Sequence, residues 1–160
     1  MNPGHLIRRL RDTDDDVALG MELVHEYVVA TADETGHDVD LILPLIAELH
    51  DFRAHYLERG AFLVAHLDGP AGCVGVTPGL AETCEMNRLW VRPAFRRAGL
   101  ARALSEASMR AARDLGFTRM ALDVVPTRTG AIALYRSLGF TDTEPLHEYP
   151  FPMVPLARAL

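Results

Sequence analysis

Lysine is absent from this 160-residue chain, so arginine supplies all sixteen of its cationic side chains. Cysteine is scarce as well. Cys73 and Cys84 are too few for a disulfide framework, and we therefore expect a cytoplasmic protein. The net charge is acidic, at −6. Because neutralisation of phosphates supplies most of the affinity for nucleic acid, this charge argues against nucleic acid as the main partner.

Long apolar runs are also absent. No stretch of the sequence approaches the length needed to span a membrane, and residues 1–10 lack the continuous apolar core of a signal peptide, so we expect no membrane partner. Hydrophobic residues make up 49% of the chain and charged residues 24%, which is ordinary for a soluble globular protein. We expect residues 1–160 to form a single domain with a sizeable core.

The hydrophobic pattern predicts an α/β protein with a mixed sheet. Strands are predicted over residues 5–10, 62–66, 72–77, 84–91 and 120–124. Helices are predicted over residues 13–30, with Thr13 as N-cap, and over 44–60, 99–115 and 130–138. Four prolines between residues 145 and 155 predict that any final strands are interrupted and near an edge of the sheet.

The order of these elements predicts where a cleft forms. An antiparallel meander ends in the strand at 84–91, and a helix separates this strand from the one at 120–124, so the last two should be parallel with a right-handed crossover. Where a sheet changes from antiparallel to parallel pairing, the two neighbouring strands can separate at one end. We expect a cleft at that point.

A basic stretch lies between those two strands. Residues 88–102 hold five of the sixteen arginines and no acidic residue. The stretch is predicted to be a loop that feeds a helix beginning near Gly99, where unpaired N–H groups and the helix dipole favour a phosphate. A side chain at Gly99 would hold a phosphate away from the backbone. A solvated basic turn before an ordinary helix is the alternative.

A second motif follows about thirty residues later and makes the first one specific. Arg96, Gly99 and Ala101 fill the pattern [Q/R]-x-x-G-x-[G/A], and Ala131, Leu134, Tyr135, Gly139 and Phe140 fill A-x-x-L-Y-x-x-x-G-F. From about residue 84 to residue 140 the chain resembles the GNAT superfamily of N-acetyltransferases. The resemblance implies a GNAT-like fold and direct transfer of an acetyl group from acetyl-CoA, as co-substrate, to the amine of a small molecule or a peptide.

The resemblance also implies a location for the cofactor. Acetyl-CoA would enter the cleft with backbone groups of Leu89 and Val91 beside its acetyl and pantetheine portion. The pyrophosphate would be surrounded by Arg96, Arg97, Ala98, Gly99, Leu100 and Ala101. Two positions depart from the family pattern. Arg128 stands where an Asn often contacts the pantetheine, and Arg97 and Ala98 replace an additional Gly of the loop.

Two residues are candidates for the chemistry. Tyr135 would protonate the departing thiolate, because a phenol (pKa about 10) is comparable in acidity to a thiol (about 8.5); a half-buried core tyrosine is the alternative. Glu85 would remove the proton of the amine, with Glu82 in reserve; the alternative is a surface glutamate on an edge strand. The N–H of Val91 would stabilise the oxyanion.

Other groups have simpler interpretations. Cys84 has no activating partner nearby in the sequence and is more simply a small buried strand residue. His50 and His55 lie on different helix faces, and we predict no metal site. The acidic connection of residues 33–40 is either a solvated loop or a collar for a cationic acceptor.

Three questions stay open in the sequence. A non-catalytic acyl-CoA-binding module with the same fold is the main alternative function, and Arg128 favours it. An ordinary dinucleotide-binding domain is disfavoured because G-x-G-x-x-G is missing. The identity of the acceptor and the oligomeric state, homodimer or otherwise, cannot be read from the residues.

Overall fold

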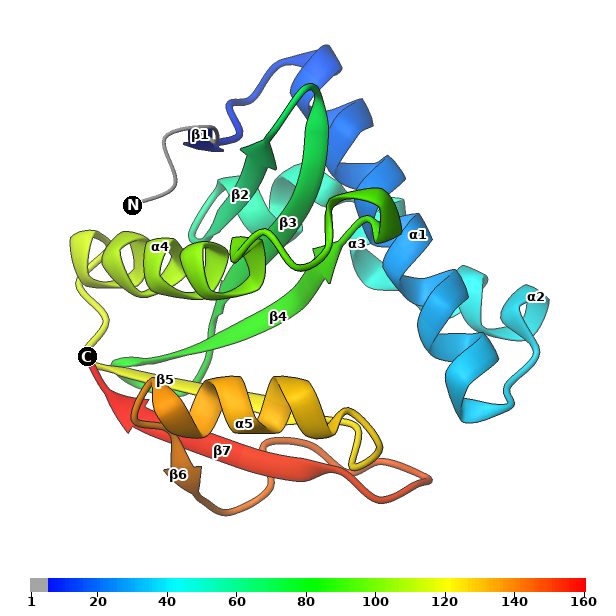
Figure 1. Cartoon of the computed structure of the whole chain (residues 1–160). Coiled ribbons are helices and arrows are strands. Elements are labelled where there is room, and N and C mark those ends of the chain that lie inside the picture. Colours follow the sequence, from blue (N-terminus) through cyan, green and yellow to red (C-terminus); the bar gives the residue numbers. More distant parts are fainter. Residues whose placement is uncertain (1–5) are drawn as a thin grey trace.

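A computed structural model describes residues 6–160 and shows a seven-stranded mixed sheet in the order β1-β2-β3-β4-β5-β7-β6 (Figure 1). The strands are β1 (Leu6–Arg9), β2 (Ala61–His66), β3 (Pro70–Pro78), β4 (Thr83–Val91), β5 (Arg119–Val124), β6 (Thr141–Asp142) and β7 (Val154–Ala159). The pair β4–β5 is parallel, and the other neighbours are antiparallel. The predicted mixed sheet and its parallel pair are therefore confirmed. Of the first predicted strand, residue 5 lies outside the described residues.

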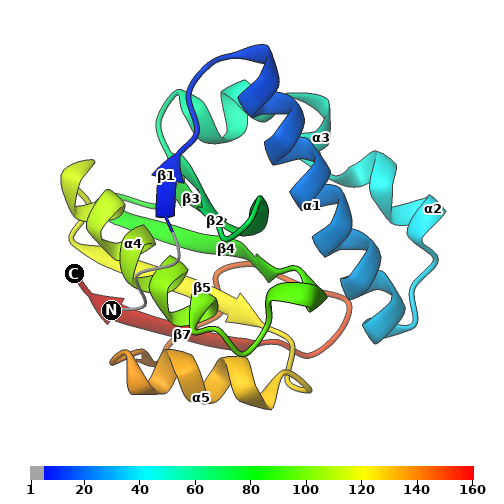
Figure 2. The same ribbon diagram turned by 45° about the horizontal axis from the view of Figure 1, so that its top comes forward.

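Helices cover both faces of this sheet. They are α1 (Asp14–Thr35), α2 (Val39–Ile42), α3 (Ala47–His50), α4 (Leu100–Asp114) and α5 (Thr129–Ser137), with short 3-10 or π turns at 43–45, 53–57 and 93–95. α4 and α5 lie on one face, and α1 with the 43–57 segment lies on the other (Figures 1 and 2). Each face has its own apolar cluster, around Leu104 and Phe140 on the first and around Phe52 and Tyr56 on the second.

The first helix is longer than predicted. Thr13 is the N-cap, as expected, but α1 continues to Thr35 rather than ending near residue 30. Gly36 ends it in the left-handed conformation, with φ at 72°, and its N–H group bonds back to the helix. The prediction of a loop from residue 31 is therefore wrong for its first half, because the C-capping glycine is at 36.

The predicted helix over residues 44–60 is broken into short turns. Ile46 and Asp51 have non-helical backbone angles and interrupt it. The Asp51 side chain accepts a hydrogen bond from the N–H of Ala54 at 3.0 Å and so starts a new turn. This turn directs Tyr56 into the core, where it is fully buried.

The proline-rich tail lies near an edge of the sheet, as predicted, but its last strand is not interrupted: β7 runs through Pro155 from Val154 to Ala159. β7 contains Pro155 and lies next to the edge, covered there only by the two residues of β6. Residues 143–153 before β7 form no helix or strand. They pass instead over one end of β4 and β5, where they become part of a cavity.

The strands β4 and β5 part after a short contact. Glu85 pairs with Ala121, and beyond this pair no β4 residue pairs with β5, which continues along β7 alone. Just past the separation β4 carries a β-bulge, in which Arg88 and Leu89 together oppose one residue of β3. The predicted parting of the strands is present, and Figure 1 shows β4 diverging from β5 toward α1.

A buried ion pair holds the bulge. Arg88 has a left-handed backbone, with φ at 53°, which is a costly conformation for a residue with a side chain. Its guanidinium donates to Glu48, which is 2% exposed. Burial alone would raise the pKa of Glu48, but the charge and hydrogen bond of Arg88 outweigh burial and hold that pKa below its ordinary value. Tyr56 adds a 2.8 Å hydrogen bond from its hydroxyl to the side chain of Asn87.

We predict that Arg88→Ala lowers the free energy of unfolding by about 3–5 kcal/mol, because the buried Glu48 carboxylate loses its guanidinium partner and keeps, among the described residues, only the longer contacts to Tyr56 and His55. Arg136→Ala breaks an exposed pair with Asp142 and is the control, with a loss of at most about 1 kcal/mol. Urea denaturation followed by circular dichroism measures both. Equal losses would show that the buried pair does not hold the bulge.

Candidate active site

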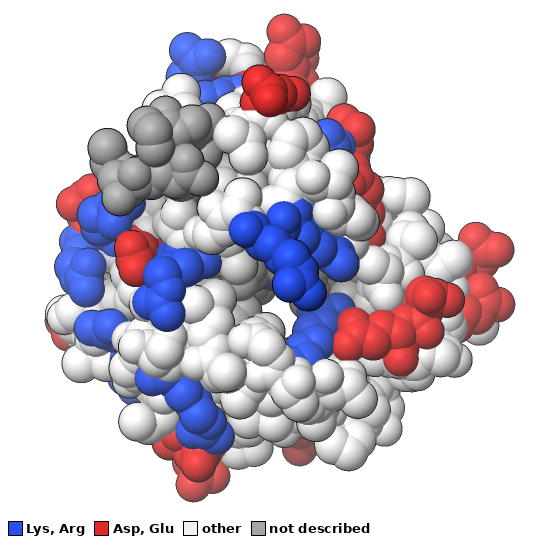
Figure 3. Space-filling view, viewed as in Figure 1, with Lys and Arg blue, Asp and Glu red and all other residues white. Residues whose placement is uncertain are grey.

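Two cavities meet where β4 and β5 part. The larger, of about 760 Å³, lies at the basic loop and the start of α4. The smaller, of about 430 Å³, lies between the parted strands, α1 and the 147–153 segment. Leu89, Arg128 and Ala131 line both cavities, so a ligand of the first can reach a ligand of the second at these residues. Figure 3 shows the face hollowed near its centre, with arginine side chains around the hollow.

The larger cavity has the features of an anion site. α4 begins after Gly99, whose φ of 77° turns the chain and which has open space where a side chain would be. The N-terminal N–H groups of α4 and the side chains of Arg97 and Arg102 face the same cavity. Of the six predicted loop residues, 96–101, only Ala98 does not line the cavity; it packs against the core instead.

The end of β4 turns main-chain groups toward this cavity. The N–H of Arg92 donates to Ala71 of β3 at 2.8 Å. Since successive residues of a strand turn these groups to opposite sides, Val91 and Leu89 turn theirs away from β3 and toward the split. The Arg96 side chain reaches the carbonyl oxygen of Val91 at 3.1 Å, which agrees with this orientation.

Some arginines of the basic stretch form ion pairs with acidic residues, and the others line the larger cavity. Arg88 is paired with Glu48, and Arg92 lies 3.0 Å from Glu22 and 2.6 Å from Glu26 on α1. The arginines that line the larger cavity from this stretch are Arg96, Arg97 and Arg102. The sequence suggested one basic site of five arginines, and the structure reduces it to three.

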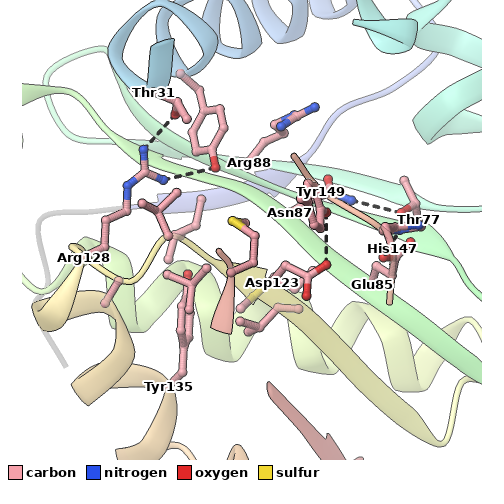
Figure 4. Close-up of a pocket in the computed structure, with 18 of the residues that line it drawn as sticks. Thr31, Thr77, Glu85, Asn87, Arg88, Asp123, Arg128, Tyr135, His147 and Tyr149 are labelled. Atoms are coloured by element: carbon pink, nitrogen blue, oxygen red, sulfur yellow. Dashed lines mark hydrogen bonds and ion pairs between the residues drawn. The ribbon is translucent and has the colours of Figure 1, made fainter. Parts of the chain in front are cut away.

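Tyr135 points into the smaller cavity from α5 (Figure 4). It is 7% exposed, and its hydroxyl makes no hydrogen bond to any residue between 6 and 160. Burial raises its pKa well above the ordinary value, the nearby Tyr27 raises it further, and Arg128 opposes them. The hydroxyl is therefore protonated and free to donate to a ligand.

Glu85 lines the same cavity, whereas Glu82 does not. The Oε1 atom of Glu85 lies 2.7 Å from Nε2 of His147. Glu82 instead accepts a hydrogen bond from the hydroxyl of Thr118 at 3.1 Å. Since β4 lies inside the sheet, the alternative of a surface glutamate on an edge strand is wrong.

Three residues of this cavity were missed in the sequence. Asp123 accepts a hydrogen bond from the Tyr149 hydroxyl at 3.0 Å, and His147 contacts Glu85 (Figure 4). Burial raises the pKa of Asp123 and Glu85 adds to this, partly offset by Tyr149 and His147. A single acid in an apolar strand was a usable signal for Asp123. Nothing local marks the two tail residues, whose position depends on the path of residues 143–153.

Arg128 bridges α1 and α5 where the cavities meet. It precedes α5 and donates to Glu34 at 2.8 Å, to the Tyr27 hydroxyl at 3.1 Å and to Thr31 at 2.7 Å. Its guanidinium also lies 5.2 Å from the centroid of the Tyr27 ring. Asp33 and Glu34 belong to the acidic connection that was expected to form a collar for the acceptor. Neither residue lines the smaller cavity, so they form no collar there.

The remaining candidates have structural roles. Cys84 is fully buried, and burial raises its pKa to about 12, so its thiol is unsuited to act as a nucleophile. Nε2 of His50 lies 2.6 Å from the carbonyl oxygen of Pro44, and His55 lies near Glu48. Residues 6–160 hold no group of three or more side chains suited to bind a metal ion. Within the same range, no helix is long and apolar enough to cross a membrane.

Comparisons with known proteins agree with this geometry. An uncharacterized N-acetyltransferase of Schizosaccharomyces pombe is 36% identical over 151 residues, which cover 92% of this chain and 88% of that protein. The fold matches an acetyltransferase from Streptococcus agalactiae with a TM-score of 0.77, 19% identity and 99% of each chain covered. It also matches a Salmonella typhimurium protein solved with its cofactor acetyl-CoA, with a TM-score of 0.70, 24% identity and coverage of 98% of this chain and 94% of that one.

The family assignment rests on the sequence itself. The family model described as "Acetyltransferase (GNAT) family" matches residues 24–140, which include the basic loop, the split strands and Tyr135. This match excludes the alternative of an ordinary dinucleotide-binding domain. The chain belongs to the GNAT family of acetyltransferases.

Proposed function

We propose that the protein transfers the acetyl group of acetyl-CoA directly to a primary amine, without an acetyl-enzyme intermediate. One observation carries the proposal: the anion-binding cavity and the cavity of Tyr135 meet at Leu89 and Ala131, between the parted strands. The related Salmonella protein holds acetyl-CoA, which supports the same cofactor here. The high pKa of Cys84 supports direct attack over a thiol relay.

The larger cavity would hold the cofactor from two sides. Its pyrophosphate would lie on the N–H groups at the start of α4, with Arg96, Arg97 and Arg102 adding positive charge. Its pantetheine arm would pair with the main-chain groups that Leu89 and Val91 turn toward the split, much as a short strand would. This arrangement brings the thioester to the junction of the two cavities.

Glu85 would accept the proton of the incoming ammonium group. It lies four residues before Leu89 on β4, roughly 10–13 Å along an extended strand, so the proton would pass through water. His147, hydrogen bonded to Glu85, would orient the carboxylate. The amine nitrogen then attacks the thioester carbonyl carbon, and the N–H of Val91 stabilises the oxyanion.

Tyr135 would complete the reaction as the C–S bond breaks, by donating its proton to the departing sulfur. Burial raises the pKa of this phenol, which disfavours the donation. The thiolate, however, forms in the same buried region, where its pKa rises for the same reason. The pKa values of the phenol and of the CoA thiol therefore rise together, so the difference between them, which governs the proton transfer, changes little.

A non-catalytic acyl-CoA-binding module is the second candidate, and Arg128 is the observation in its favour. Incubation of acetyl-CoA with a panel of primary amines, with detection of free thiol and acetylated amine, separates the two functions. The proposal expects thiol release that depends on the amine. Binding of acetyl-CoA without any turnover across the panel would identify a binding module.

A first prediction concerns Gly99. Gly99→Ala should weaken CoA binding about tenfold or more, because a methyl group would enter the anion site and displace charge-assisted hydrogen bonds. Gly116→Ala is a matched control: Gly116 also has a positive φ, of 93°, and open space, but it lies outside both cavities. Both variants carry similar backbone strain of about 1 kcal/mol. Equal CoA affinities in titration calorimetry would remove the loop from the cofactor site.

A second prediction concerns Tyr135. Tyr135→Phe keeps the ring and its packing but removes the proton, so kcat should fall by roughly 10²–10⁴ with CoA affinity little changed. The loss should shrink with an acyl donor whose thiol is more acidic, because that leaving group needs less help. A Tyr135→Phe enzyme as fast as wild type, under conditions where chemistry limits the rate, would end the assignment.

A further inference from the structure

The smaller cavity contains more negative charge than one amine can neutralise. Its lining includes two carboxylates, Glu85 and Asp123, that form no ion pair with any arginine between residues 6 and 160. The two arginines that line this cavity are already neutralised, Arg88 by Glu48 and Arg128 by Glu34. Neither carboxylate is therefore paired with an arginine of the described residues, and the partner of Glu85 is His147, which carries a charge only when protonated.

The two carboxylates lie on one face of the sheet. Glu85 pairs with Ala121, and Asp123 follows two residues later on β5, so the Asp123 side chain points to the same side as Ala121. Asp123 lies toward the open end of the split, nearer to the junction with the cofactor cavity. Burial and, to a smaller extent, the charge of Glu85 raise the pKa of Asp123, whereas the hydrogen bond from Tyr149 and the charge of His147 lower it.

Aromatic rings cover the carboxylates. The tail segment places His147, Tyr149 and Phe151 over them. The ring centroid of Tyr149 lies 6.2 Å from that of His147 and 5.8 Å from that of Phe151. Figure 4 shows Tyr149 and His147 beside Asp123 and Glu85. A carboxylate beside aromatic faces is a favourable environment for an organic cation.

A further polar group faces the same cavity. Tyr135 is more than nine-tenths buried, and its hydroxyl points into the same cavity without a hydrogen-bond partner among the described residues. The ring is buried, whereas the hydroxyl oxygen is open to the cavity, where a ligand or water can bond to it. The acids and the hydroxyl thus face one shared space.

A charge count over the reaction defines that ligand. An acceptor with a single amine enters as an ammonium ion and loses its proton to Glu85, after which both are neutral and Asp123 remains unpaired. This count holds with His147 neutral; a protonated His147 would stay charged after Glu85 has taken the proton and would itself offset Asp123. With His147 neutral, a second positive charge on the acceptor that is retained through the reaction compensates Asp123.

We infer that the acceptor is a dicationic amine, such as a diamine, whose non-reacting cationic group is bound by Asp123 beside the ring of Tyr149. The inference rests on the proposed acetyl transfer and narrows its substrate class. The same lining disfavours an acceptor that places a carboxylate in the cavity, since neither lining arginine is free to receive one.

The test compares two acceptors with equal numbers of non-hydrogen atoms, 1,5-diaminopentane and hexylamine, with acetyl-CoA at one pH. The wild-type protein should show a kcat/KM at least about tenfold higher for the diamine, the gain expected from one charge-assisted hydrogen bond. Asp123→Asn should reduce this preference to near unity, mainly by lowering kcat/KM for the diamine. Asp114→Asn, which changes an exposed acid at the end of α4 outside the cavity, is the control and should retain the preference.

The outcomes separate this inference from the proposed function. Equal kcat/KM values for the two amines in the wild type would overturn the inference and leave acetyl transfer standing. An equal loss for both amines in Asp123→Asn would overturn it as well, because it would assign Asp123 to proton removal or to folding. Absence of transfer to every amine, with acetyl-CoA still bound, would reject the proposed function and the inference together.

Discussion

The parting of β4 from β5 is the constraint on which both cavities depend. A sheet that continued its pairing past Glu85 would use the main-chain groups of β4 internally and would leave no space between the strands. The bulge at Arg88 and Leu89 turns β4 away, and the buried Arg88–Glu48 pair compensates the strained backbone of that turn. A strained residue therefore lies beside the candidate site, where strained backbone is often found.

Positively and negatively charged side chains around the split occupy different positions. Helix α1 and the segment after it supply carboxylates that neutralise Arg92, Arg128 and Arg88, so these arginines fasten α1 and its neighbours to β4 and α5. Arg96, Arg97 and Arg102 line the larger cavity, and Glu85 and Asp123, which pair with no arginine among the described residues, line the smaller one. An anionic cofactor and a cationic amine would thus approach the junction from opposite sides.

The features that could be predicted from the sequence are those encoded within one short segment. The helix that begins after Gly99 and the helix that carries Tyr135 lie where predicted, because a strand end, a left-handed glycine and a helix start are local properties. The contact of His147 with Glu85 joins residues 62 positions apart, and the Arg88–Glu48 pair spans 40 positions. Such contacts depend on the tertiary path of the chain, and no local pattern marks them.

The most direct test of the account is a crystal structure of the protein with CoA bound. The account predicts that the pantetheine arm lies between β4 and β5, bonded to the main chain of Leu89 and Val91, with the pyrophosphate at the start of α4. It also predicts that the CoA sulfur lies within about 3–4 Å of the Tyr135 hydroxyl. A complex in which CoA binds outside the split, or in which the sulfur points away from Tyr135, would contradict the central claim that the parted strands form the site of acetyl transfer.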